Sequence, residues 1–299
     1  MKKLSKFLSM ILIAALIMTG FTGFSGSKKV SAAEGVNVYV SISDRGDLVL
    51  KQKSVEVTDV DADGALTISD ALYCAHEKYY KGGAEAGYEC YYNEAYMSLS
   101  LSKLWGYDEG TSFDYYVNDQ MSMGLSDPIS EGDYLNAFVY VDQPGYSDKY
   151  SFFNAHKIGV KNGASKKIAL YVYDGYDENW MPIKKAMKNA KIIINEKETD
   201  YVTGKKGKVT LNLEKSGSYF ISAVSDDVTL VPPTCLVFVQ PAKGEIIEVK
   251  DKKYTVTKLG KVSTGKKGKV TFSKSANGDK EAPKTIEYAG VTYKVKVVD

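Results

Sequence analysis

Residues 59–70 constrain this chain most, because acidic side chains alternate there with small residues around one glycine. Aspartates occupy the first, third, fifth and twelfth positions, and the glycine at the sixth allows a sharp turn. Carboxylates this close together repel one another unless a divalent cation lies among them. We therefore predict a structural calcium ion, with ligands from Asp59, Asp61, Asp63, the Ala65 carbonyl, Thr67 and Asp70.

The end of this segment also fits a helix cap. Thr67 and Asp70 have the spacing of a capping box for a helix over residues 70–80. That interpretation leaves the three earlier aspartates without a role. The twelve residues resemble the calcium loop of dockerin modules, which also close with aspartate and carry an apolar residue, here Leu66, at position eight. Since the sequence has no second such loop, we expect it to pin a strand to the helix rather than to support cellulosome docking.

The first 33 residues are typical of a secretory signal peptide. Lysines at positions 2, 3 and 6 precede an apolar stretch, and Val30-Ser31-Ala32 offers a small-residue cleavage site. The apolar stretch is short for a bilayer span. The sequence therefore predicts a secreted, extracellular protein, which a partner could retain at the cell surface, with no membrane span after cleavage.

The rest of the chain predicts a multidomain protein. One helix followed by short strands indicates an N-terminal α+β domain over residues 34–155, which begins with a strand pair turning at Arg45-Gly46. Strands without a helix predict an all-β, immunoglobulin-like sandwich over 156–242, with a long loop at 174–188. A small all-β module follows over 243–299. The octamer at 203–210 recurs letter for letter at 264–271, which predicts the same turn and strand in both places.

A series of motifs in the first part supports a more specific comparison. They are Thr67-x-x-Asp70, Leu104-Trp105-Gly106, Tyr115-Tyr116-Val117-Asn118, the stretch 125–129 and Glu131-Gly132-Asp133-Tyr134. Their order resembles an extracellular family named for its likeness to the C-terminal domain of transcobalamin. The resemblance implies a β-grasp-like fold, a helix on a mixed sheet, and relatives that cap or bind small ligands such as cobalamin. Asp119 departs from the family, where a glycine commonly follows the asparagine, so the family's ligand is not carried over.

Two weaker resemblances concern the remainder of the chain. The segments 207–211 and 217–221 resemble paired strands of bacterial surface immunoglobulin-like modules, and the stretch from Pro283 to Val295 resembles segments beside leucine-rich repeats in bacterial surface proteins. These resemblances imply a surface protein of several binding or spacer modules.

Charge divides the mature chain into two halves. Residues 34–155 hold 7 basic and 21 acidic side chains, a net of −14, whereas residues 156–299 hold 27 and 16, a net of +11. The lysine-rich half suits an anionic cell-envelope polymer as a partner. Lysines that only solvate strand edges and turns would give the same count. No nucleic-acid-binding motif accompanies them, so nucleic acid is not an expected partner.

Three cysteines make an odd number for a secreted chain. Cys74 lies on the predicted helix and Cys90 follows the turn after it, so a disulfide could join the returning chain to the helix. The sequence leaves both the bridged and the free form open. Cys235 has the surroundings of a buried strand residue.

Tyrosine is abundant in the first part, more than one core can readily bury. We expect an aromatic ligand-binding face that includes Trp105, Tyr115 and Tyr116, although strand-favouring surface tyrosines would look the same. No catalytic constellation stands out, and His76 is expected on the helix surface. The leading hypothesis is a non-catalytic, calcium-stabilised adhesion protein of a bacterial surface, which presents this face to an unknown protein or carbohydrate. The alternative is an extracellular protein that captures a small, cobalamin-like ligand.

Overall fold

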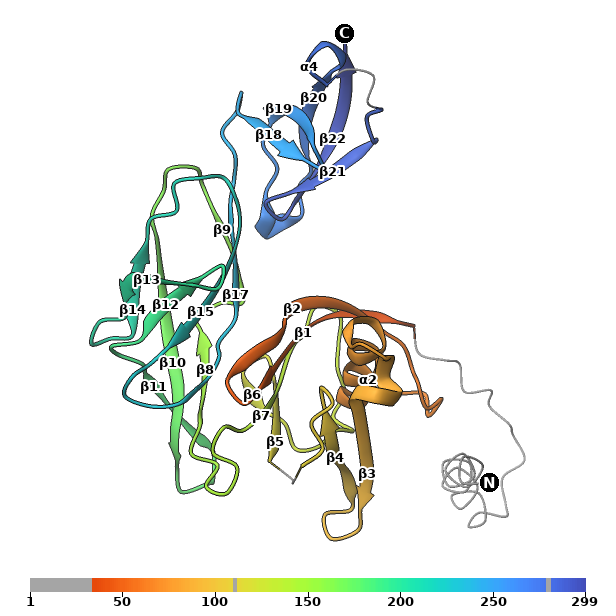
Figure 1. Cartoon of the computed structure of the whole chain (residues 1–299), viewed down its shortest axis with the longest axis vertical. Helices are drawn as coiled ribbons and strands as arrows, with labels where there is room; N and C mark the ends of the chain where they lie inside the picture. Colours follow the sequence, from red (N-terminus) through yellow and green to blue (C-terminus); the bar gives the residue numbers. More distant parts are fainter. Residues whose placement is uncertain (1–33, 110–111, 278–280) are drawn as a thin grey trace. The chain divides into compact units, whose positions relative to one another are not determined.

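The protein is built mostly from strands, which account for 51% of the structure, against 9% for helices. A computed structural model describes residues 34–109, 112–277 and 281–299 (Figure 1). The predicted signal peptide lies outside the described residues. None of the helices in the described ranges has the length and apolar character that a bilayer crossing requires. The predominance of strands, arranged in several sheets, agrees with the prediction.

The first sheet has the strand order β2-β1-β7-β5-β6, and a separate hairpin, β3–β4, lies next in the sequence to the helices α2 and α3. These elements are β1 Val36–Asp44, β2 Asp47–Val57, α2 Ile68–Tyr79, α3 Gly83–Gly87, β3 Tyr88–Asn93, β4 Ser98–Leu104, β5 Phe113–Val117, β6 Gln120–Met121 and β7 Tyr134–Val139. β1 and β2 turn at Arg45 and Gly46, both with positive φ, as tight hairpins require. This confirms the predicted strand pair. β1 also pairs with β7 in parallel, which makes the sheet mixed.

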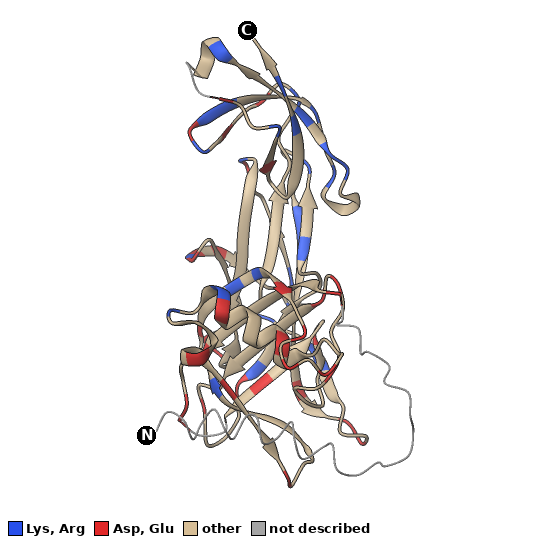
Figure 2. Cartoon of the chain, turned by 90° about the vertical axis from the view of Figure 1, so that its right-hand side faces the viewer, with Lys and Arg blue, Asp and Glu red and all other residues tan. Residues whose placement is uncertain are grey.

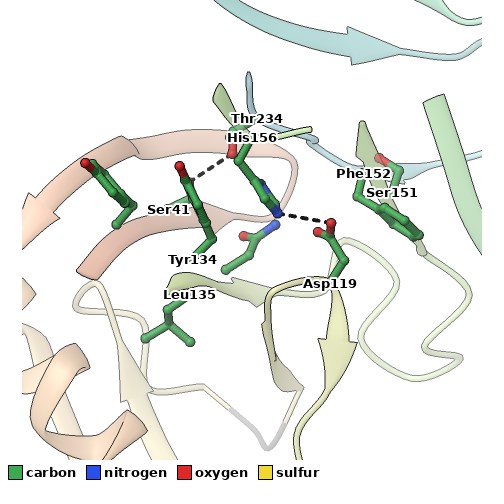
Figure 3. A pocket seen from close by; sticks show the side chains of 10 residues that line it. Ser41, Asp119, Tyr134, Leu135, Ser151, Phe152, His156 and Thr234 are labelled. Carbon is green, nitrogen blue, oxygen red and sulfur yellow. Dashed lines mark hydrogen bonds and ion pairs between the residues drawn. The ribbon is translucent and has the colours of Figure 1, made fainter. Parts of the chain in front are cut away.

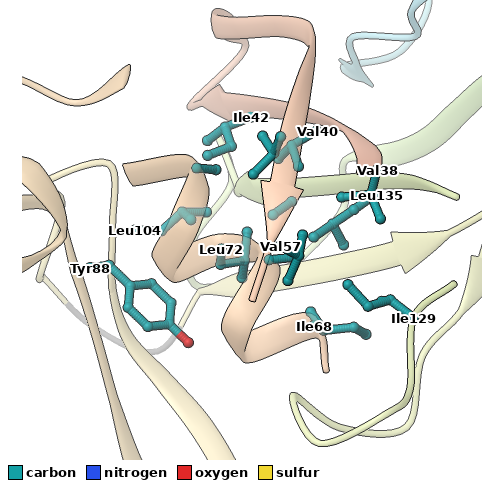
Figure 4. Close-up of a cluster of buried hydrophobic side chains, with 14 of the residues drawn as sticks. Val38, Val40, Ile42, Val57, Ile68, Leu72, Tyr88, Leu104, Ile129 and Leu135 are labelled. Carbon is teal, nitrogen blue, oxygen red and sulfur yellow. The ribbon is translucent and has the colours of Figure 1, made fainter. Parts of the chain in front are cut away.

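Helix α2 packs on this sheet through the apolar side chains that recur along one of its faces. Ala71, Leu72 and Ala75 are fully buried and belong to one cluster with the sheet residues Val38 and Val57 (Figure 4). The helix begins after Thr67, which forms the predicted capping box with Asp70. It ends at Tyr79, close to the predicted end. The acidic segment 59–67 therefore lies between the last strand residue of β2 and the first turn of a buried helix.

The middle of the chain forms two further sheets, whose inner faces share one core. Their orders are β11-β10-β8-β16, with β14 paired to β10, and β13-β12-β15-β17-β9. The strands are β8 Lys149–Phe153, β9 Lys157–Val160, β10 Lys166–Tyr176, β11 Pro182–Ala186, β12 Lys191–Ile194, β13 Lys197–Val202, β14 Lys208–Leu211, β15 Gly217–Val224, β16 Leu230–Val231 and β17 Cys235–Val239. Buried side chains of both sheets, such as Leu170 and Ile221, belong to the same cluster.

Two sequence expectations for this region differ from the structure. β8 pairs with β10 and β16, so residues 149–153 belong to the middle sheets and not to the predicted first part. The predicted loop at 174–188 is largely a hairpin of β10 and β11, in which Tyr173 pairs with Lys184. Four of the five residues of β11 are exposed, so the strand lacks the alternation of buried and exposed side chains by which a strand is predicted.

The last sheet has the order β18-β19-β20-β22-β21 around its own buried cluster, with Tyr254, Phe272 and Tyr293 among the largest members. Its elements are β18 Ile246–Val249, β19 Lys252–Lys258, η1 Val262–Thr264, β20 Gly268–Ser273, α4 Lys274–Asn277, β21 Thr285–Tyr288 and β22 Val291–Val298. β20 and β22 are parallel, and the other neighbours are antiparallel. Lysines lie along several of these strands (Figure 2).

Candidate functional site

The acidic loop brings three of its predicted ligands together. Oxygen atoms of Asp59, Asp61 and Asp63 lie within 4.8 Å of one another. Burial and the neighbouring charge of Asp63 raise the pKa of Asp61, as expected for carboxylates that crowd one another. An all-oxygen set of this kind fits calcium, which prefers carboxylate and carbonyl ligands.

Backbone N–H groups hold this loop in its turned shape. The Asp59 carboxylate accepts hydrogen bonds from the N–H groups of Asp63, at 3.1 Å, and Gly64, at 2.9 Å. The Asp63 carboxylate accepts one from Ala65 at 2.8 Å. Gly64 has a φ of +91°, which a side chain would strain. The loop is thus already curved around its carboxylates.

Asp70 joins both ends of the loop. One of its oxygens accepts the Val60 N–H at 2.9 Å, and the other accepts the Thr67 N–H and hydroxyl at 2.9 and 2.7 Å. Its side chain is buried, at 3% exposure. The helix cap and the closed acidic loop therefore occur together. The Asp70 carboxylate caps α2 and also holds the two ends of the acidic loop together. The metal assignment itself remains a prediction.

A second candidate site is a groove of about 410 Å³ between the β3–β4 hairpin and β5. Its lining is aromatic and neutral. The lining residues are Tyr91, Asn93, Tyr96, Ser100, Leu101, Phe113 and Tyr115. Burial raises the pKa of the Tyr115 phenol to about 12, so its hydroxyl stays protonated at neutral pH.

Only one of the three predicted aromatic ligand residues lines this groove. Tyr115 lines it, but Tyr116 points to the opposite face of β5, where its ring stacks on Tyr150 with centroids 3.7 Å apart. Trp105 packs against His76 and Tyr80 instead, at 5.2 and 5.1 Å between centroids. Successive residues of a strand alternate between faces, so sequence periodicity already separates Tyr115 from Tyr116.

His76 is buried rather than on the helix surface, which corrects the expectation. Its exposure is 0%, and burial lowers its pKa to about 4. Nδ1 lies 2.7 Å from the Leu72 carbonyl oxygen, and Nε2 accepts the Trp105 N–H at 2.9 Å. The neutral ring therefore joins α2 to the end of β4. Leu72 and Ala75 lie on the same face of the helix as His76. The period of the helix therefore predicts that His76 is buried with them.

The three cysteines are free thiols in the structure. The Cys74 sulfur lies 3.9 Å from the Thr58 hydroxyl, and the Cys90 sulfur lies 3.9 Å from the Ser69 hydroxyl. Ser69 and Cys74 are separated by about 140° around the helix axis, so the two sulfurs approach different sides of α2. Of the two forms that the sequence left open for Cys74 and Cys90, the structure has the free one. Cys235 is fully buried, as expected.

A small polar cavity lies where the first sheet meets the strands of the middle sheets (Figure 3). The Asp119 carboxylate lies 3.0 Å from His156 Nε2 and accepts the Tyr150 hydroxyl at 3.1 Å. The ring of Tyr134 stacks on His156 at 4.2 Å. The cavity volume is about 10 Å³, enough for about one water molecule and too small for a substrate. These contacts fit a structural junction.

Asp119 occupies this junction at a conformational cost. Both Asn118 and Asp119 have positive φ, 51° and 62°, in the turn from β5 to β6. Glycine adopts that conformation most readily, so a non-glycine residue is strained there. The contacts of Asp119 with His156 and Tyr150 offset the strain. The sequence drew attention to Asp119, but it did not identify the partners of Asp119, which are distant along the chain.

Comparison of the chain with protein-family models and with curated proteins finds no match to either.

Proposed function

We propose that this is a secreted, non-catalytic binding protein of a bacterial cell surface, whose N-terminal α+β, β-grasp-like domain binds a neutral glycan in the tyrosine-lined groove. An immunoglobulin-like sandwich and a small β module follow it in the proposed architecture. The observation that carries the proposal is the chemistry of the groove, which combines aromatic rings with uncharged hydrogen-bonding groups.

Sugar rings present apolar faces and many hydroxyl groups, and the groove offers a counterpart to each. Tyr91 and Tyr115 supply flat rings for stacking, while their hydroxyls, Asn93 and Ser100 supply donors and acceptors. The Asn93 amide lies 3.4 Å from the Tyr91 hydroxyl, so neighbouring groups already interact. Such a lining favours a neutral ligand over a charged one.

The lining also favours binding over hydrolysis. Glycoside hydrolysis usually needs a pair of carboxylates at the reacting bond. The lining residues include no aspartate, glutamate or histidine. Asp114 lies between two lining residues on β5, but it points to the other face, where its carboxylate accepts the Tyr140 hydroxyl at 3.0 Å.

We propose calcium as the structural ion of the acidic loop. Asp59, Asp61 and Asp63 would hold it, with the Ala65 carbonyl, Thr67 and Asp70 completing the set. The convergence of three carboxylates at the start of a buried helix supports this role. The ion would stabilise α2, the helix that precedes the β3–β4 hairpin of the groove. It would make no contact with the ligand in the groove.

A second function is favoured by the size of the groove. Its volume of about 410 Å³ falls within the range of small-molecule sites, so capture of a compact cofactor is the alternative. Calorimetric titration of the mature protein with neutral oligosaccharides and with cobalamin distinguishes the two. We expect binding of an oligosaccharide, and binding of cobalamin alone would favour the alternative.

Neighbouring tyrosines on one strand provide a matched test of the groove. Tyr91 lines it, whereas Tyr92 does not, although their exposures are similar at 43% and 54%. Loss of the stacking ring in Tyr91→Ala should weaken oligosaccharide binding about tenfold, or about 1.4 kcal/mol. Tyr92→Ala should leave the affinity unchanged. Equal affinities for the two variants, or no oligosaccharide binding by the wild type, would contradict the glycan assignment.

A further inference from the structure

The positive charge of the second half is concentrated in its last part. Residues 243–299 hold 14 lysines and 7 acidic side chains, a net of +7, whereas residues 156–242 hold 13 and 9, a net of +4. The outward positions of the last sheet carry many of these lysines. We call Lys258, Lys269, Lys294 and Lys296 the lysine face, and all four are exposed.

Strand register places three of these lysines in one row. Lys258 on β19 pairs with Lys269 on β20, which pairs with Lys294 on β22. Neighbouring strands lie about 4.8 Å apart, so the three Cα positions span about 10 Å across the sheet. Lys296 follows Lys294 on the same face, opposite Thr271.

A β-bulge completes the row. The register shifts between Val256 and Lys258, and without this shift Thr257 would stand opposite Lys269. Bulges can re-aim a side chain in this way. The local backbone therefore brings a third lysine beside two others, although like charges directly opposite one another destabilise a sheet.

Among the described residues, the row has no acidic partner that neutralises it. Within the described residues, the ammonium groups of Lys258, Lys269 and Lys294 form no ion pair. The outward carboxylates are on the flanking strands, where Glu248 pairs in register with Lys253 and Glu287 with Thr292. An external polyanion would supply the missing negative charge along the row.

The chemistry of the face favours a polyanion without bases. Besides lysine, the outward positions of β19, β20 and β22 carry threonine and serine, such as Thr255, Thr271 and Ser273, and no aromatic ring for base stacking. The chain's single arginine, Arg45, is elsewhere. Lysine binds phosphate as a point charge without demanding a fixed geometry.

We propose that the lysine face binds a linear, phosphate-bearing polymer of the bacterial cell envelope and thereby attaches the protein to the surface. This inference is independent of the glycan groove, which lies in a different sheet. Loss of polymer binding would leave oligosaccharide binding intact, so the two proposals can fail separately.

The repeated octamer supplies a control of equal charge. The test compares the full mature chain carrying Lys258→Gln, Lys269→Gln and Lys294→Gln with one carrying Lys205→Gln, Lys206→Gln and Lys208→Gln. All six lysines are exposed. Binding is measured against long-chain inorganic polyphosphate from low to high salt, with single-stranded DNA and neutral dextran alongside. Circular dichroism checks that both variants fold.

We expect the wild type to bind polyphosphate with a strong salt dependence and to ignore dextran. The lysine-face variant should lose at least tenfold in affinity at low salt, and the slope of log K against log salt should fall by about 2. The control variant should change little. Bacterial cell walls should retain the protein before, and not after, chemical removal of their phosphate polymers. Equal losses in both variants, tighter binding to DNA, or retention by the stripped walls would overturn the proposal.

Discussion

The acidic loop before α2 and the lysine face of the last sheet both gather like charges, but their backbones arrange them differently. In the loop, three carboxylates converge within 4.8 Å and accept hydrogen bonds from nearby N–H groups. In the lysine face, strand register sets Lys258, Lys269 and Lys294 in a row, and within the described residues their ammonium groups form no ion pair. A convergent cluster suits a point ion, and a row suits a polymer. The comparison thus separates two kinds of ligand by backbone shape.

Calcium removal tests the convergent cluster and carries the largest expected effect. At a free calcium concentration one hundred times the dissociation constant, binding stabilises the folded protein by about 2.7 kcal/mol. Chelation should therefore lower the melting temperature by about 5 to 10 °C. Hydrogen exchange by mass spectrometry should locate the loss in β2 and α2 and leave β18–β22 unchanged.

Two variants separate the ion from the cap. Asp61 takes no part in the capping box, so Asp61→Ala should abolish the calcium-dependent shift. Thr67→Ala removes the cap, which should cost about 1 kcal/mol whether or not calcium is present. Identical melting temperatures of the wild type in chelator and in millimolar calcium would refute the metal assignment.

Acid distinguishes the two regions, because His76 is buried in the last turn of α2, the helix that follows the acidic loop, whereas the last sheet contains no histidine. The folded pKa of His76, about 4, is below its unfolded value of about 6.5, so the unfolded state binds the extra proton. This contribution to stability is complete above pH 6.5 and is lost as pH falls towards 4. Between pH 7 and 5 we expect a loss of about 2 kcal/mol in the free energy of unfolding.

Denaturant unfolding at the two pH values measures this loss through tryptophan fluorescence. His76→Gln removes the titration but keeps a polar side chain, so its unfolding free energy should fall less between pH 7 and 5. A parallel fall in both proteins would assign the acid sensitivity to groups other than His76.

Local sequence predicted the acidic loop because its contacts connect near neighbours, such as Val60 with Asp70 and Thr67 with Asp70. The groove could not be located in this way, since β3, β4 and β5 contribute to it together. The period of helix α2 was sufficient to predict that His76 is buried. The alternation of side chains along β5 was sufficient to predict that Tyr116 and Tyr115 lie on opposite faces. Long-range pairing, such as that of Asp119 with His156, leaves no local pattern.

The two copies of the octamer have identical sequences but differ in part of their backbone conformation. Both copies lead into a strand with a buried valine, Val209 or Val270. Their turns differ, because positive φ falls on Gly207, the fifth residue, in the first copy and on Gly265, the second residue, in the other. The alternation of apolar and polar residues determined the strand in both copies. Contacts with the surrounding chain determined the conformation of each turn. The prediction of a strand in both copies is therefore confirmed, and the prediction of the same turn in both copies is wrong.

The smallest expected effect tests repulsion within the lysine row. Lys294→Glu places a carboxylate beside Lys269, and an opposite-charge pair should stabilise the sheet by about 0.2 to 1 kcal/mol. The same change on Lys208, which pairs with Ala169 rather than with a lysine, should give no such gain. Denaturant unfolding at low and at 1 M salt measures both variants, and screening should abolish the gain. A neutral or destabilising Lys294→Glu at low salt would show that the row is not repulsive, and the argument for an external polyanion would lose its physical basis.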